Sequence, residues 1–305
     1  VVNAVLIAVR QAAIVLCDRW TLLVLLHAQA GVTRFADLRE RCGCASRLLT
    51  SRLAMLEQQE LLVRLPYSRR PLRHGYHLTP MGLALFDTFA ALLRWQLRWH
   101  GPDSAGGLQL DHLACGQAAI APDMACGHCA AEVLAREVSL KISQKELQAM
   151  PGRASAYRRT GAAPAADGSG PAGPLPHALA TLGDKWTIEV VMAAFVRVHT
   201  FGGFQAHTGM ATNILADRLA RLVAGGVLRQ AQDGSDQRRG DYRLTPAGLD
   251  LFGLLVCIEA WADHWLHDRT RSPMRLLHRP CGQPLQLRLS CPHCQQALLR
   301  EDSRW

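Results

Sequence analysis

Lysine is scarce in this sequence, and the positive charge of the chain is almost all arginine. Of 34 basic residues only Lys141, Lys145 and Lys185 are lysine, and the formal net charge is +9. A surplus of arginine favours a polyanionic partner, because guanidinium groups pair with phosphates in a forked geometry and displace their counterions. The alternative interpretation is a solvated basic surface without a partner.

Catalytic motifs and long apolar runs are absent as well. The sequence has no glycine-rich phosphate loop, dinucleotide fingerprint, GxSxG motif or paired His/Glu metal-hydrolase motif. Its most apolar stretch, residues 1–16, is too short to span a bilayer and is interrupted by Asn3, Arg10 and Gln11. That stretch also lacks the basic leader and the cleavage site of a signal peptide. We therefore expect a cytoplasmic protein that is not an enzyme and has no membrane segment.

What the sequence does contain is an internal repeat. Trp20 in CDRWTLLVLL and Trp186 in GDKWTIEVVM are 166 residues apart. Rare residues that match in constant register over roughly one hundred positions indicate two copies of one domain. The same offset relates Phe35 to Phe201, Arg52 to Arg218, Tyr76 to Tyr242, Trp95 to Trp261, and Trp99 to Trp265.

Each copy is predicted to be mainly α-helical with a small β-wing. In copy 1 the apolar residues after Trp20 predict a first helix, and FADLRERCG predicts a short second one. ASRLLTSRLAMLEQQELL predicts a third helix, with Leu49, Leu53 and Leu56 on one face. VRLPYSRRPLRHGYHLT reads as a hairpin with a basic tip, and MGLALFDTFAALLRWQLRWH as a long amphipathic helix. This order is that of a winged helix-turn-helix domain.

The predicted organisation is therefore two tandem winged helix-turn-helix domains, each with its own core and each followed by a short Cys/His segment. A Pro/Gly/Ala-rich linker separates the two halves. Residues 130–149 are expected to form an amphipathic helix in the tail of copy 1. The expected boundaries are 1–100 for copy 1, 108–149 for its Cys/His tail, 150–176 for the linker, 177–268 for copy 2 and 274–305 for the second Cys/His segment.

These segments resemble the HxlR-type winged-helix regulators. The matching stretches are DRWTLLVL and GDKWTIEV, RFADLRE with LLTSRLAMLEQQELLVR, and the YHLTPMG and YRLTPAG junctions. The resemblance implies a regulator that binds double-stranded DNA, with repression as the expected sign, and that dimerises through its first and last helices. In a tandem chain that pairing is either an intramolecular pseudo-dimer or a homodimer. The tryptophans at 95, 99, 261 and 265 are then core residues or interface anchors.

A helix that reads DNA needs an outward face that is small and polar enough to enter the major groove. The alternative for such residues is an ordinary solvated helix face. In copy 1 the candidates are Ser46, Arg47, Thr50 and Ser51, with Arg52 toward the DNA backbone and Arg69, Arg70, Arg73 and His74 in the wing. In copy 2 they are Thr212, Asn213, Ala216, Asp217 and Arg218, with Arg238 and Arg239 in the wing.

Copy 2 is expected to be the weaker reader. Residues 33–79 contain nine arginines and four acidic residues, whereas residues 199–245 contain six arginines and four aspartates. Asp217 would repel phosphate unless it met a cytosine amino group. Both reading helices also have alanine, Ala45 and Ala211, where the resemblance implies a capping serine, so Ser46 or Thr212 is a candidate cap instead.

Cysteine and histidine form two matched clusters. Three thiolates and one imidazole at these spacings suit a tetrahedral structural Zn²⁺ site, and each site is expected to close on its own short segment. His128 and His293 are alternative fourth ligands. The clusters are His112-x2-Cys115-x10-Cys126-x2-Cys129 and His278-x2-Cys281-x9-Cys291-x2-Cys294.

Other interpretations of the cysteines and of the domains stay open. CGHC and CPHC resemble disulfide oxidoreductase motifs, but that chemistry needs a helix start inside a βαβ unit. A tail regulated by thiol oxidation is the second alternative. Cys17 reads as a small buried residue, and alkylation of Cys42 or Cys44 would disturb the helix-turn-helix. A winged-helix module for protein assembly is the alternative to DNA binding.

Overall fold

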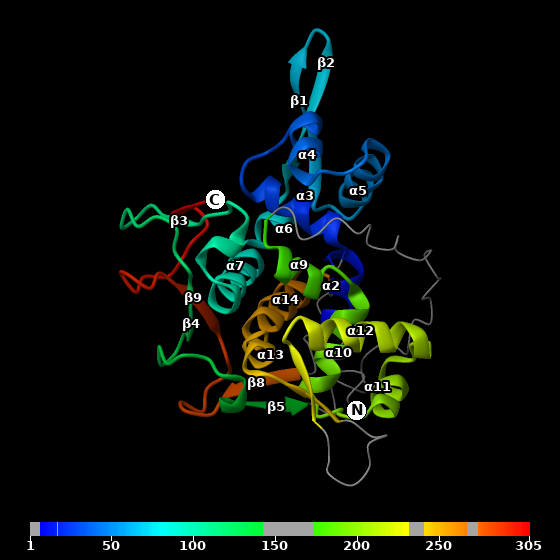
Figure 1. Cartoon of the computed structure of the whole chain (residues 1–305). Coiled ribbons are helices and arrows are strands. Elements are labelled where there is room, and N and C mark those ends of the chain that lie inside the picture. The colour runs from blue at the N-terminus through cyan, green and yellow to red at the C-terminus, as the bar shows by residue number, and fades with distance from the viewer. Residues whose placement is uncertain (1–6, 17, 143–173, 232–240, 267–273) are drawn as a thin grey trace.

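The structure is a computed structural model that describes residues 7–16, 18–142, 174–231, 241–266 and 274–305. Figure 1 shows the two helical copies lying against each other, the wing of copy 1 projecting at the top, and strands of the two tails side by side along one flank. Within those described ranges, no helix is both long enough and apolar enough to cross a membrane.

Copy 1 has the predicted order of helix, helix, turn, helix, wing and long helix. The helix after Trp20 begins where Asp18 accepts a hydrogen bond from the Thr21 amide, and the short second helix ends at Gly43, whose φ of 65° is left-handed. The third helix buries the apolar face predicted for it. The elements are α2 (Ile7–Leu16), α3 (Arg19–Gln29), α4 (Phe35–Cys42), α5 (Ser46–Gln58), β1 (Leu62–Arg69), β2 (Leu72–Leu78), α6 (Pro80–Leu83), α7 (Phe86–His100) and the 3₁₀ turn η1 (Pro102–Ala105).

Copy 2 repeats these elements with a shorter described wing. Its strands pair from Leu228 opposite Leu244 to Ala231 opposite Asp241. Arg238 and Arg239, the predicted wing contacts of this copy, lie outside the described residues, as does most of the predicted linker. The elements are α9 (Pro176–Leu182), α10 (Lys185–Phe195), α11 (Phe201–Thr208), α12 (Thr212–Ala224), β6 (Leu228–Ala231), β7 (Asp241–Leu244), α13 (Pro246–Asp250) and α14 (Phe252–Trp265).

The two copies meet along a seam made by the first and last helices of each. Helix α2 packs on α14, α9 packs on α7, and α7 packs on α14. Two equivalent hydrogen bonds cross this seam: Trp95 Nε1 donates to the Ala247 carbonyl at 2.8 Å, and Trp261 Nε1 donates to the Met81 carbonyl at 3.0 Å. Because each copy gives the other the same contact, the seam has the reciprocity of a two-fold interface inside one chain.

One hydrophobic core spans both copies. Trp95 and Trp261, 1% and 4% exposed, belong to a single buried cluster that includes residues from every helix of the seam. The cores of the two copies are therefore continuous across the seam. The physical reason is that α2 packs on α14 and α10 of the other copy, while α9 packs on α7 and α3 of the other copy as well as on its own α10.

The tails of the two copies are also joined, strand by strand. The predicted helix over residues 130–149 is wrong where the structure describes it: a 3₁₀ turn, η2 (Ala135–Glu137), leads into a strand, and residues 143–149 lie outside the described part. Each tail strand of copy 1 pairs antiparallel with one of copy 2. The pairs are β3 (Asp111–His112) with β10 (Ser303–Arg304), β4 (Asp123–Cys126) with β9 (Leu287–Ser290), and β5 (Val138–Ile142) with β8 (Met274–His278).

Candidate nucleic-acid interface and metal centres

The reading face predicted for copy 1 is solvent-exposed on α5. Ser46, Arg47, Thr50 and Ser51 are all exposed, while Leu49 between them is buried and Leu48 is half-buried. The alternative cap is wrong: the N-cap is Ala45, it makes no side-chain cap hydrogen bond, and Ser46 is already helical. The Ser46 hydroxyl instead accepts a hydrogen bond from Arg39 Nη1 at 3.3 Å. This leaves a small polar surface with arginine at the start of the helix.

Arg52 occupies a different place from its neighbours on α5. Its Nε and Nη2 donate to the two carboxylate oxygens of Asp18 at 2.8 and 3.1 Å. Asp18 caps α3 and forms a β-bridge with Asp184 of the other copy. In copy 2, Arg218 Nε forms an ion pair with Asp184 Oδ2. Both predicted DNA contacts are therefore engaged within the chain, where they tie each reading helix to the seam.

The wing of copy 1 carries its predicted arginines on the surface. Arg69, Arg70 and Arg73 are exposed around the hairpin tip, which projects from the body in Figure 1. Arg34, which the sequence prediction missed, lies over the Tyr67 ring of β1 with its guanidinium carbon 5.0 Å from the ring centre. The sequence does indicate this residue, because Arg34 is a basic residue directly before the short second helix α4.

Copy 2 presents a less basic surface at the corresponding positions. Thr212 and Asn213 are exposed at the start of α12, but Asp217 is exposed there too and pairs with Arg218 and, at 2.9 Å, with Arg221. The Thr212 hydroxyl accepts a hydrogen bond from Gln205, which stands where copy 1 has Arg39. Thr212 is not a cap either, since Ala211 holds that position.

The eight predicted metal ligands come together, but not in the predicted sets. His112 and Cys115 of copy 1 lie with Cys291 and Cys294 of copy 2, and the remaining four residues form the second set. Within each set the ligand atoms all lie within 4.8 Å of one another. Closure of each cluster on its own segment is therefore wrong, because pairing of β4 with β9 places the Cys-x2-Cys turn of one tail beside the His-x2-Cys turn of the other. The second set is Cys126, Cys129, His278 and Cys281.

Tight turns shape both sets. Gly116 and Gly282 follow Cys115 and Cys281 with φ of 71° and 70°, a left-handed conformation that favours glycine. Cys126 ends β4, and a turn rather than a helix follows it. That placement lacks the helix start that an oxidoreductase CxxC motif needs, so the structure gives that interpretation no support.

The cysteines outside these sets are poorly suited to react. Burial raises the pKa of the Cys42 thiol to about 12, with neighbouring Cys44 adding to the shift. Burial likewise raises the pKa values of Cys44 and Cys257. Because the thiolate is the reactive form, these three side chains are weak nucleophiles in the folded chain. Cys17 lies outside the described residues.

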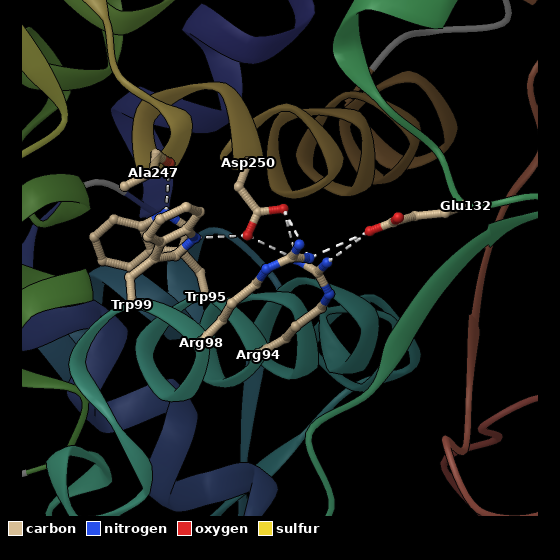
Figure 2. A network of polar contacts seen from close by, with 7 residues as sticks. All are labelled: Arg94, Trp95, Arg98, Trp99, Glu132, Ala247 and Asp250. Carbon is tan, nitrogen blue, oxygen red and sulfur yellow. Dashed lines mark hydrogen bonds and ion pairs between the residues drawn. The ribbon is translucent and has the colours of Figure 1, made fainter.

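A charged network reinforces one side of the seam. Figure 2 shows Arg94 and Arg98 of α7 reaching Asp250 at the end of α13, with Glu132 of the tail on their other side. Arg94 Nη1 lies 2.9 Å from Asp250 Oδ1, and Trp99 Nε1 donates to Asp250 Oδ2 at 2.8 Å. At the positions related by the 166-residue offset, the chain has Ala260 for Arg94 and Ala84 for Asp250. The seam is thus reciprocal in its tryptophan hydrogen bonds and asymmetric at the Arg94–Asp250 pair.

The paired copies and their exposed reading helices define a tandem winged helix-turn-helix protein. The sequence profile of the HxlR-like helix-turn-helix family matches residues 15–104 and 181–270, and the chain belongs to this family. The profile matches twice, once in each copy.

The relatives are named as transcriptional regulators. Rv3095 of Mycobacterium tuberculosis, described as an uncharacterized HTH-type transcriptional regulator, is 38% identical over 122 residues, which are 40% of this chain and 77% of the relative. YtfH of Escherichia coli K12, described in the same words, is 38% identical over 79 residues, or 26% of this chain and 63% of the relative. The crystal structure of PA1607, a candidate transcription factor, shares 37% identity over 43% of this chain and 92% of that one, with a TM-score of 0.39.

Proposed function

We propose that this chain is a cytoplasmic, sequence-specific regulator that binds one double-stranded DNA site with both of its winged helices, and that it represses by occluding the promoter. The observation that carries this proposal is the exposed polar face of α5, with Arg47 at its start and the exposed arginines of the wing beside it. A helix with such a face suits base edges in the major groove, and arginines at a wing tip suit phosphates.

The seam supports this function because it orients the two reading helices. Asp18 and Asp184 meet in a β-bridge between the copies, and each carboxylate holds the arginine of its own reading helix. Both reading helices are thereby anchored at the same β-bridge between the copies. Arg52 and Arg218 are therefore proposed as positioning residues, and Arg47, Thr50 and Asn213 as contacts with DNA.

The Cys/His sets are proposed to hold structural Zn²⁺. Atoms bound at about 2.0–2.3 Å to one tetrahedral zinc ion lie about 3.5–3.8 Å apart. The observed separations are 3.8 Å for Cys115 Sγ to Cys291 Sγ and 3.9 Å for Cys126 Sγ to Cys281 Sγ. The histidine Nδ1 to sulfur separations of 3.1 to 3.5 Å have the same scale. Three thiolates and one imidazole are a donor set that zinc prefers.

The DNA proposal is tested by selecting bound duplexes from a random pool and measuring affinity for the selected site by fluorescence anisotropy at several salt concentrations. Arg47→Ala is expected to weaken binding about tenfold or more, because a bidentate base contact contributes about 1–3 kcal/mol. Asn213→Ala is expected to have a smaller effect if copy 2 is the weaker reader. Arg136→Ala, which removes an exposed arginine in the tail, is the matched control and should bind normally. Absence of binding at low salt to every duplex would contradict the proposal.

A second prediction separates contact from positioning on the same helix. Arg47→Ala should leave thermal stability unchanged, since the Arg47 side chain is exposed and makes no ion pair within the described part of the chain. Arg52→Ala should lower both DNA affinity and the melting temperature, because Asp18 loses its bidentate partner at the seam. Differential scanning fluorimetry beside the anisotropy measurement checks this. A stability loss in Arg47→Ala, or none in Arg52→Ala, would contradict the assignment.

A further inference from the structure

We propose that the two zinc ions are shared between the copies, so that metal binding fastens the two DNA-reading halves of the chain together. This inference rests on the proposed zinc sites and adds which residues share an ion and what the ions do. Each set takes a His-x2-Cys turn from one tail and a Cys-x2-Cys turn from the other. Neither tail therefore supplies more than half of any one set.

The backbone holds the exchanged turns in place. His112 lies opposite Ser303 in the β3–β10 pair, and His278 lies opposite Val138 in the β5–β8 pair. The Gly127 amide, between the two cysteines of its turn, donates to the Gln286 carbonyl of the other tail at 2.7 Å. These contacts are made by main-chain atoms, so the exchange does not depend on side-chain rotamers at the ligands.

The joined tails pack against the seam itself. Met124 of β4 lies over Gly253 of α14, and the Phe86 ring of α7 meets the Trp305 ring edge-on with centroids 5.9 Å apart. Strand β9 contacts both α7 and α14. A metal ion that binds both tails therefore stabilises the positions of α7 and α14, the last helix of each copy. Because these helices form the seam, the ion also helps to fix the distance between the two reading helices.

Counting zinc in full-length double variants tests the sharing directly. The wild-type chain is expected to hold two ions, and Cys115→Ser one. Cys115→Ser with Cys294→Ser should still hold one ion, because both residues belong to the same set. Cys115→Ser with Cys129→Ser should hold none, because those residues belong to different sets. Sites closed within each tail give the reverse order, which would overturn the proposal.

The two double variants are matched. Both lose two thiols and share Cys115→Ser, so a general folding defect cannot produce opposite zinc counts. Cys44→Ser removes a thiol outside both sets and should retain two ions. A wild-type chain that binds no zinc would overturn the zinc proposal itself, whereas two ions with the reversed order would overturn only the sharing.

Protection of thiols from labelling in the single variant gives a second test of the sharing if a double variant does not fold. In Cys115→Ser, iodoacetamide labelling followed by peptide mass spectrometry is expected to modify Cys291 and Cys294, which have lost their metal. Cys126 and Cys129 should stay protected by the intact second site. Labelling of Cys126 and Cys129 instead would show that each tail closes its own site.

The fastening role is tested on DNA in the same preparations. The variant without zinc is expected to bind the selected duplex about tenfold or more weakly than the variant that keeps one ion, because tails without metal hold α7 and α14 less firmly and the two reading helices then lose part of the advantage of binding together. Equal affinities would overturn the fastening role. If neither variant nor the wild type binds any duplex while the zinc counts follow the expected order, the regulator proposal fails and the shared sites stand.

Discussion

Replacing Arg94 with alanine is expected to lower the free energy of unfolding by about 3 kcal/mol, because it leaves a carboxylate in the seam without its main partner. The Arg94 and Asp250 side chains are 7% and 15% exposed. Asp250→Ala should cost at least as much, since the buried guanidinium then keeps only Glu132, at 3.7 Å. Urea denaturation followed by far-UV circular dichroism measures both losses.

Arg98→Ala is the matched control for this prediction. Arg98 lies one helical turn further along α7 and reaches the same two carboxylates, at 3.2 Å for Glu132 and 3.6 Å for Asp250. Its side chain is 46% exposed, so water screens its interactions, and the expected loss is below about 1 kcal/mol. Equal losses for Arg94→Ala and Arg98→Ala would contradict the argument from burial.

The double variant Arg94→Ala with Asp250→Ala should recover most of the lost stability. The physical reason is visible on the other side of the seam, where the offset-related residues are Ala260 and Ala84 and Trp261 of α14 still donates its hydrogen bond to Met81 of α6. Replacing both members of a buried ion pair by apolar residues is often neutral, whereas removing one member is not. Losses that simply added in the double variant would contradict this account.

The same asymmetry determines which copies can pair well. If copy 1 met another copy 1, Arg94 would face Ala84, and if copy 2 met another copy 2, Asp250 would face Ala260. Either arrangement deprives a largely buried charge of its main partner. The tryptophan hydrogen bonds do not discriminate in this way, because both copies have the tryptophan and the acceptor carbonyl. The charges of the seam thus favour the pairing of unlike copies.

Local pattern was sufficient to predict the repeat and the winged-helix order. The leucines of α5 repeat on one face, and Leu49, Leu53 and Leu56 are buried as their spacing indicates. The strand β5 shows where local pattern was misread. Val138, Leu140 and Ile142 alternate with polar residues, a period of two that indicates a strand, yet the segment was predicted as a helix. Its partner β8 lies far away in the sequence, so nothing local revealed the pairing.

The ligand sets could not be predicted from spacing. Both tails contain a His-x2-Cys and a Cys-x2-Cys turn, so closing a set within a tail or between tails gives the same three cysteines and one histidine. Only the pairing of β4 with β9 decides between them. The ion pair between Arg52 and Asp18 could not be predicted from local pattern either, because 34 residues separate them and the packing of α5 on α3 brings the guanidinium to the capping carboxylate. The Arg94–Asp250 pair does leave a signal in the sequence, because each of these two charged residues has alanine at the offset-related position of the other copy.

Gly82→Ala is expected to destabilise the chain by about 3 kcal/mol, although it adds a single methyl group. A Cβ at this position would lie less than 3.0 Å from the Leu61 carbonyl oxygen and 2.8 Å from Leu78 Cδ2. The carbonyl is main chain at the start of the wing, so it cannot turn aside. The Gly82 carbonyl also accepts a hydrogen bond from Gln29 Nε2 at 2.9 Å, in the interior of copy 1.

The effect of Gly82→Ala should extend across the seam, since the preceding residue, Met81, accepts the hydrogen bond from Trp261. Displacing α6 therefore moves the wing and weakens a contact with copy 2 together. Gly248→Ala should behave alike, because its Cβ would meet the Val227 carbonyl in the same way. Gly202→Ala is the matched control: its Cβ would meet nothing within 4 Å, and alanine should stabilise α11 by about 0.5 kcal/mol. In thermal and urea unfolding, Gly82→Ala should therefore lower the stability and Gly202→Ala should raise it. A loss of stability in Gly202→Ala as large as in Gly82→Ala would show that the close approach to the wing is not the cause.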